Sequence, residues 1–183
     1  MPTISRSLTL TATGGFLNVI KTKCHISEAF DMANTTIQPP TYSEFMAIWD
    51  TGATASVITQ KVVDSCGLHP IGMVEVHGVN SKHLSEVYLV NILLPNQVTF
   101  AALQVTKGQL TGDSDVLIGM DVIHKGDFAI TNMGHTVFSF RVPSQVTIDF
   151  VKEHNNKILP LTSTHGSANK PREKRKKKYG KNK

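Results

Sequence analysis

One stretch of the sequence places an acidic residue on a turn between two apolar segments: Ala47-Ile48-Trp49-Asp50-Thr51-Gly52-Ala53-Thr54-Ala55-Ser56-Val57-Ile58. The pattern predicts a strand over residues 44–49, a turn over 50–53 and a second extended segment over 56–58. A carboxylate between two buried segments is unfavourable unless something compensates its charge. The sequence therefore predicts that some group compensates the charge of Asp50.

Length and composition predict one globular domain rich in strands. The chain has 183 residues, of which 40% are hydrophobic, and this is enough for a core of ordinary size. Cys24 and Cys66 belong to no metal-binding or redox motif, which favours reduced thiols and a cytoplasmic location. We expect no secretory signal and no membrane span, because no apolar run is long enough.

The net charge of +5 comes from the end of the chain. Residues 170–183 hold nine Lys or Arg and one acid, so the rest of the chain carries a net charge of −3. This basic tail has three interpretations: a nonspecific contact with a polyanion such as nucleic acid, a localisation signal, or a solubilising end. We expect residues 151–183 to form a flexible tail.

The first 41 residues predict a strand or hairpin extension. Residues 3–11 alternate between apolar and polar, Gly14-Gly15 turns the chain, and residues 16–23 form a second apolar segment, so the pattern predicts a hairpin. Pro39-Pro40 then breaks any element that precedes the Asp50 turn. The main domain is expected over residues 42–150.

Short elements are expected throughout that domain. Thr59 as a cap and Gly67 as a stop signal predict a helix over residues 60–66. A second short helix is expected to begin at Gly119 and to end before Gly126. The further predicted strands are 73–77, 83–94, 98–106, 127–130, 136–140 and 146–150.

Two landmarks together resemble the retropepsin-like aspartic proteases. The Asp-Thr-Gly-Ala turn at residues 50–53 is followed 63 positions later by Val116-Leu117-Ile118-Gly119, and a glycine-containing hairpin lies between them. The resemblance covers roughly residues 42–142. It implies an all-β fold, namely a single retropepsin-like acid-protease domain with one or two short helices, which acts as a homodimer without a metal or other cofactor.

The resemblance also assigns roles to individual residues. Asp50 would be catalytic, and Thr51, Gly52 and Ala53 would support the active-site turn. Ile118 and Gly119 would belong to a substrate pocket or to the core. The tip of the hairpin would form a flap over an extended peptide substrate, with the residues Val76, His77, Gly78, Val79 and Asn80.

The number of Asp-Thr-Gly turns decides how such a site is built. Two carboxylates that share one proton can activate a water molecule and protonate a peptide carbonyl. The chain contains a single Asp-Thr-Gly sequence, so the second carboxylate would come from Asp50 of a second copy. The resemblance therefore implies a C2 homodimer that hydrolyses peptide bonds as an endopeptidase.

Two positions depart from the viral members of the family. Those members usually carry an acid directly after Asp-Thr-Gly-Ala and an arginine after the second glycine, and the two side chains form an ion pair. Here the positions are Thr54 and Met120. Both halves of the ion pair are missing together, which indicates the cellular or bacterial branch of the family.

Alternative interpretations remain open. In an inactive member Asp50 would only cap its turn, and the protein would be a non-catalytic dimeric peptide-binding module. The basic tail could instead make the protein a nucleic-acid-associated factor. The hairpin of residues 73–94 could be an ordinary surface hairpin, and Asp121 is interpreted as a helix or turn acid. The scattered histidines show no metal-binding spacing.

Overall fold

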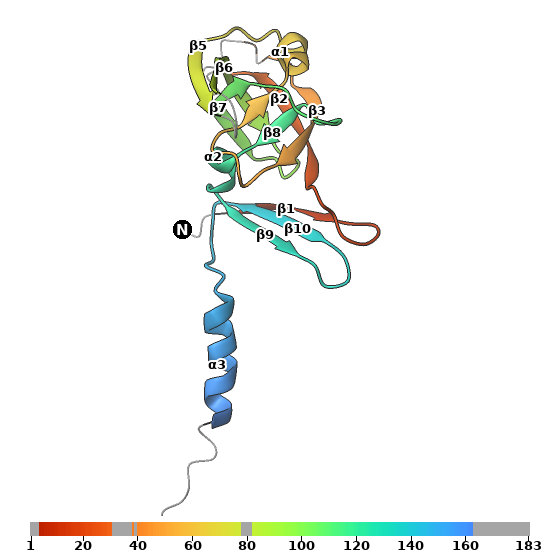
Figure 1. Cartoon of the computed structure of the whole chain (residues 1–183), viewed down its shortest axis with the longest axis vertical. Coiled ribbons are helices and arrows are strands. Elements are labelled where there is room, and N and C mark those ends of the chain that lie inside the picture. The colour runs from red at the N-terminus through yellow and green to blue at the C-terminus, as the bar shows by residue number, and fades with distance from the viewer. Residues whose placement is uncertain (1–3, 31–37, 39, 78–81, 163–183) are drawn as a thin grey trace, which may run out of the picture. The chain divides into compact units, whose positions relative to one another are not determined.

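The computed structural model describes residues 4–30, 38, 40–77 and 82–162. The chain divides into two compact units, Met1–Val146 and Thr147–Lys183. Figure 1 shows the elements. The described strands are β1 (Arg6–Thr11), β2 (Lys21–Glu28), β3 (Ser43–Trp49), β4 (Val57–Ile58), β5 (Gly72–His77), β6 (Lys82–Leu93), β7 (Thr99–Lys107), β8 (Val116–Ile118), β9 (Asp127–Thr131) and β10 (Val137–Val142). The described helices are α1 (Gln60–Cys66), α2 (Met120–Ile123) and α3 (Phe150–Thr162).

A large mixed sheet dominates the first unit. Its strand order is β2-β3-β8-β4-β7-β6-β5, and β2 pairs also with β6. Strands β3 and β8 are parallel neighbours, with Trp49 opposite Ile118. The prediction of an all-β fold with one or two short helices is confirmed for this unit, which contains α1 and α2. The parallel pair brings the two sequence landmarks together.

A smaller sheet with the order β1-β10-β9 lies below the large one in the view of Figure 1. Its aromatic side chains pack on Trp49, the last residue of β3. The Trp49 ring lies 4.9 Å from Phe140, 5.1 Å from Phe138 and 6.0 Å from Phe128, measured between ring centroids. Trp49 also donates a hydrogen bond from Nε1 to Oγ1 of Thr22 at 3.0 Å. The residue before Asp50 is therefore fixed by both sheets.

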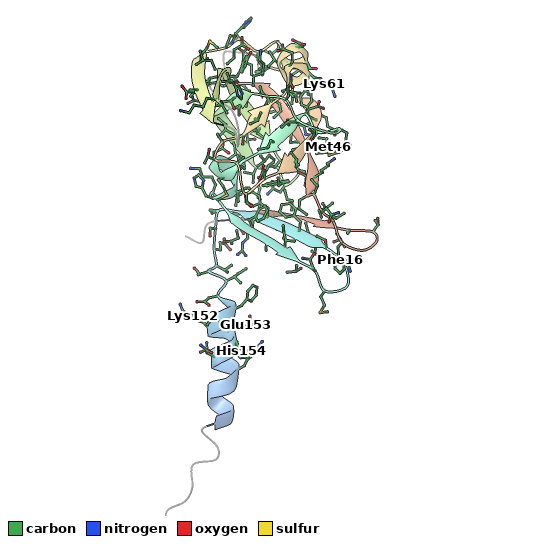
Figure 2. All side chains as sticks on the ribbon, viewed as in Figure 1. Phe16, Met46, Lys61, Lys152, Glu153 and His154 are labelled. Carbon is green, nitrogen blue, oxygen red and sulfur yellow. The ribbon has the colours of Figure 1, made fainter. Side chains whose placement is uncertain are left out.

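The prediction that two segments within residues 1–41 pair as a hairpin is wrong. β1 pairs with β10, from Arg6 opposite Val142 to Thr11 opposite Val137, whereas β2 pairs with β3 and β6. The connection between β1 and β2 contains no strand, and Phe16 (Figure 2) is exposed on it. The alternation of apolar and polar residues predicted that these segments are extended. It did not predict their partners, because β1 and β2 each pair with strands further along the chain and not with each other.

The short helix α1 has the predicted bounds, and only the capping hydrogen bond of Thr59 is missing. Gly67 ends the helix with φ of 61°, in the left-handed region that glycine adopts without strain. Thr59 occupies the N-cap position, but its side chain makes no capping hydrogen bond. Val62 and Val63 are buried, so packing on the sheet, rather than the predicted threonine cap, stabilises this helix.

The second unit contains a helix where a strand and then a flexible tail were predicted. α3 begins at Phe150, and Asp149 caps it by accepting hydrogen bonds from the backbone N–H groups of Val151 and Lys152, at 3.1 and 3.0 Å. The prediction of a strand at 146–150 is therefore wrong, and residues 151–162 of the predicted tail are helical. Residues 163–183, including the basic tail, lie outside the described residues.

Candidate active site

Asp50 directly follows β3 and is held by backbone contacts. Its N–H donates to the carbonyl of Ile118 at 3.0 Å, and its carboxylate Oδ1 accepts the N–H of Gly52 at 2.8 Å. Asp50 is half-buried, while Thr51 and Gly52 are exposed and Ala53 is half-buried. Among the residues that the structure describes, Asp50 has no ion-pair partner, so none of their charged groups compensates its carboxylate.

The second landmark packs tightly against the Asp50 turn. Ile118 is completely buried and therefore belongs to the core of this subunit. Gly119 is also buried, and a Cβ atom there would lie 2.7 Å from the backbone C and O atoms of Ala55. The N–H of Met120 donates to the carbonyl of Ala53 at 2.8 Å. Only glycine allows the two backbones to approach so closely.

Two residues that the sequence analysis did not assign to the site connect the same segments. Ser56 donates to the Asp121 carboxylate twice, from its N–H to Oδ2 at 2.9 Å and from its hydroxyl to Oδ1 at 2.8 Å. The Ser56 hydroxyl oxygen in turn accepts the N–H of Gly119 at 3.1 Å. Asp121 lies in the first turn of α2. An acid directly after the predicted start of this helix is the only feature of the sequence that could have indicated its role.

The hairpin of β5 and β6 is present, and part of the predicted flap can be placed on it. Val76 is half-buried and pairs with His83, and His77, the last residue of β5, pairs with Lys82. The predicted flap residues Gly78, Val79 and Asn80 lie outside the described residues. The structure therefore places the two arms of the predicted flap and not its tip.

A pocket of about 1050 Å³ opens between this hairpin, the start of α1 and the loop over residues 108–115. Lys61 (labelled in Figure 2) bridges two of its walls through an ion pair with Asp115 at 2.7 Å. A hydrogen bond from Lys107 holds the pKa of Glu86 below its usual range. Apolar lining comes from Met73, Leu84 and Leu110. The walls of this pocket are therefore partly apolar and partly charged.

No group of three or more His, Cys, Asp or Glu that could hold a metal ion occurs among the described residues. The helices that the structure describes also include none that is both long and apolar enough to cross a membrane.

Comparison with known proteins finds a matching family model for part of the chain. Residues 42–125 match the model of a family described as gag-polyprotein putative aspartyl protease. The matched segment runs from β3 to α2 and contains the Asp50 turn, the β5–β6 hairpin and Gly119. Over these residues the chain is therefore similar to the retropepsin-like aspartic proteases, which agrees with the resemblance predicted from the sequence. No curated protein matches the chain.

Three solved structures are similar to the chain. A retropepsin-like aspartic protease from Rickettsia conorii has 11% identity and a TM-score of 0.48, with 79% of this chain and 99% of that chain covered. The retroviral protease-like domain of Ddi1 from Leishmania major has 18% identity and a TM-score of 0.39, with 67% and 94% covered. A foamy viral protease-reverse transcriptase in complex with an RNA/DNA hybrid has 17% identity and a TM-score of 0.37, with 75% and 14% covered.

Proposed function

We propose that the chain is an aspartic endopeptidase whose active site forms from Asp50 of two identical subunits. The observation that carries this proposal is the half-exposed Asp50 carboxylate on a rigid turn, with no ion-pair partner among the described residues of its own chain. The chain has a single Asp-Thr-Gly turn, so a homodimer supplies the second carboxylate.

The paired carboxylates would share one proton, because two like charges in contact do not both ionise near neutral pH. The ionised carboxylate removes a proton from water, and the oxygen of that water adds to the peptide carbonyl carbon. The protonated carboxyl gives its proton to the carbonyl oxygen. The carboxyl that took the proton from water then protonates the peptide nitrogen, and the other carboxylate removes a proton from one hydroxyl of the tetrahedral intermediate as the C–N bond breaks. Thr51, Gly52 and Ala53 would hold the turn during these steps.

The substrate would be an extended peptide, bound by backbone hydrogen bonds as an added strand. The β5–β6 hairpin would close over it as a flap, with Val76 to Asn80 at its end. The neighbouring pocket, whose lining includes His83, Leu84 and Asp115, would accept substrate side chains.

The catalytic proposal is tested by Asp50→Asn. We expect this variant to remain folded and to lose cleavage of denatured proteins between acidic and neutral pH, whereas the wild type yields fragments in a reaction that pepstatin blocks. Asp64→Asn is the matched control, because Asp64 is an exposed acid on α1 that bonds to Gln60. Cleavage retained by Asp50→Asn would refute the proposal. Peptide binding without cleavage by the wild type would favour the non-catalytic peptide-binding module.

The basic tail has a separate proposed role. We propose that residues 170–183 make a nonspecific contact with polyanions such as nucleic acid, because they carry nine of the chain's Lys and Arg. Deletion of residues 168–183 should abolish salt-dependent binding to duplex DNA and leave peptide cleavage unchanged. Binding that survives the deletion would contradict this role.

We also propose a cytoplasmic location, because the free thiols of Cys24 and Cys66 agree with a reducing compartment.

A further inference from the structure

We infer that Ser56 and Asp121 are positioning residues of the active site, which together hold the Asp50 turn against β8 and α2. We call this pair the Ser56–Asp121 brace. Its effect on catalysis rests on the proposed function, whereas its effect on the conformation of the turn does not. The two effects are therefore tested by different measurements.

The Ser56–Asp121 brace consists of short hydrogen bonds to the Asp121 carboxylate. Asp121 accepts three hydrogen bonds between 2.8 and 2.9 Å, two from Ser56 and one from the N–H of Val122. Ser56 has no exposed surface, so water does not compete for its hydroxyl. Hydrogen bonds to an ionised carboxylate are roughly twice as strong as those between neutral groups. Asp121 has no ion-pair partner among the described residues, so these donors alone satisfy its charge.

The brace joins the same two segments of the chain as the ion pair that is missing here. In the viral relatives an ion pair would join positions 54 and 120, but here Thr54 is exposed and Met120 packs on the core. Ser56 and Asp121 lie on the same two segments, one or two residues further along. The connection between the Asp50 turn and the start of α2 is thus retained with different chemistry, as one buried hydroxyl and one carboxylate.

The brace bears on catalysis because it determines where the turn lies. The Ser56 hydroxyl links Asp121 to the N–H of Gly119, and the residue before Gly119 provides the carbonyl that accepts the N–H of Asp50. Loss of the brace would therefore loosen both ends of the Asp50 turn. Misplacement of a catalytic group by about 1 Å can lower a rate by about 100-fold.

Hydrogen exchange tests the brace without reference to activity. In Asp121→Asn and Asp121→Ala we expect the amide of Ser56 to exchange roughly 10- to 100-fold faster, as for the loss of a hydrogen bond to a charged acceptor. Amides of β6 and β7 should keep their wild-type protection, and Asp64→Asn should change none of these rates. Unchanged exchange at Ser56, or equal acceleration in every strand, would overturn the inference.

Kinetics test the consequence for catalysis. Ser56→Ala, Asp121→Asn and the double variant should each lower kcat by about 10- to 100-fold with little change in KM. The double variant should be no worse than the more damaging single variant, because both changes remove one connection. Unchanged kcat or multiplicative losses would overturn the positioning role. Absence of cleavage by the wild type would refute the proposed function, and the exchange experiment would still decide the brace.

Discussion

Replacement of Gly119 by alanine would test how closely the two landmarks must pack. The backbone at Gly119 is extended, with φ of −94° and ψ of −171°, so its conformation alone would accept any residue. The obstacle is space, because an added Cβ atom would lie 2.7 Å from the C and O atoms of Ala55 and 3.0 Å from the carbonyl oxygen of Ala53. These atoms belong to the backbone of the Asp50 turn and cannot rotate away.

The expected loss of stability follows from this overlap. Overpacking costs about 1–3 kcal/mol, and contact with three backbone atoms places Gly119→Ala at the upper end, about 2–3 kcal/mol. For a chain of this length that loss corresponds to a Tm lower by roughly 4–12 °C. The turn would also move away from α2, so cleavage should fall more than the fraction of folded protein does.

Thermal unfolding and peptide cleavage would be measured at one protein concentration, because the Tm of a dimer depends on concentration. Gly14→Ala is the matched control, since a Cβ there would meet no atom within 4 Å. We expect the control to remain within about 0.5 kcal/mol of the wild type. A Gly119→Ala variant as stable and active as Gly14→Ala would refute the close packing on which the site is built.

Two further predictions concern other titratable groups. Hydrogen bonds from Ser144, Gln145 and Arg141 hold the pKa of Asp127 well below its ordinary value of 3.8. A lowered pKa stabilises the folded state above pH 3.8, and this stabilisation is lost as the pH falls through the folded value. Asp127→Asn should therefore lower the urea midpoint at pH 7, and its difference from the wild type should shrink below pH 3.8. A constant difference would contradict this. Burial raises the pKa of Cys24 to about 12, so in the folded protein iodoacetamide at pH 8 should modify the half-buried Cys66 first, as read by mass spectrometry. Equal rates in the folded protein would contradict the burial of Cys24.

The sequence was informative wherever a short segment carries its own signal. The strand before Asp50, the stop of α1 at Gly67 and the start of α2 after Gly119 each depend on a few neighbouring residues, and the structure has them where they were predicted. No local sequence pattern predicted the parallel pairing of β3 with β8. Only the resemblance to the retropepsin-like proteases suggested that these two segments belong together.

Contacts between distant residues were not predictable in the same way. Ser139 on β10 donates to the carbonyl of Leu8, 131 positions away, while the local sequence around Gly14-Gly15 favoured a hairpin. Ser56 and Asp121 are 65 positions apart, and each is an ordinary polar residue in its own segment. The helix α3 was missed because apolar residues at 146, 148 and 150 alternate like a strand, although Asp149 is a good helix cap.

Mixing of subunits tests the central claim, that the two catalytic carboxylates come from two chains. Wild-type protein would be incubated with an equal amount of Asp50→Asn protein until the subunits exchange, and the rate of peptide cleavage would then be measured. If Asp50 of both chains is required, only wild-type homodimers are active, and random exchange should lower the rate to about one half. A rate unaffected by the inactive chain, with exchange confirmed by mass spectrometry of the dimers, would contradict the shared active site.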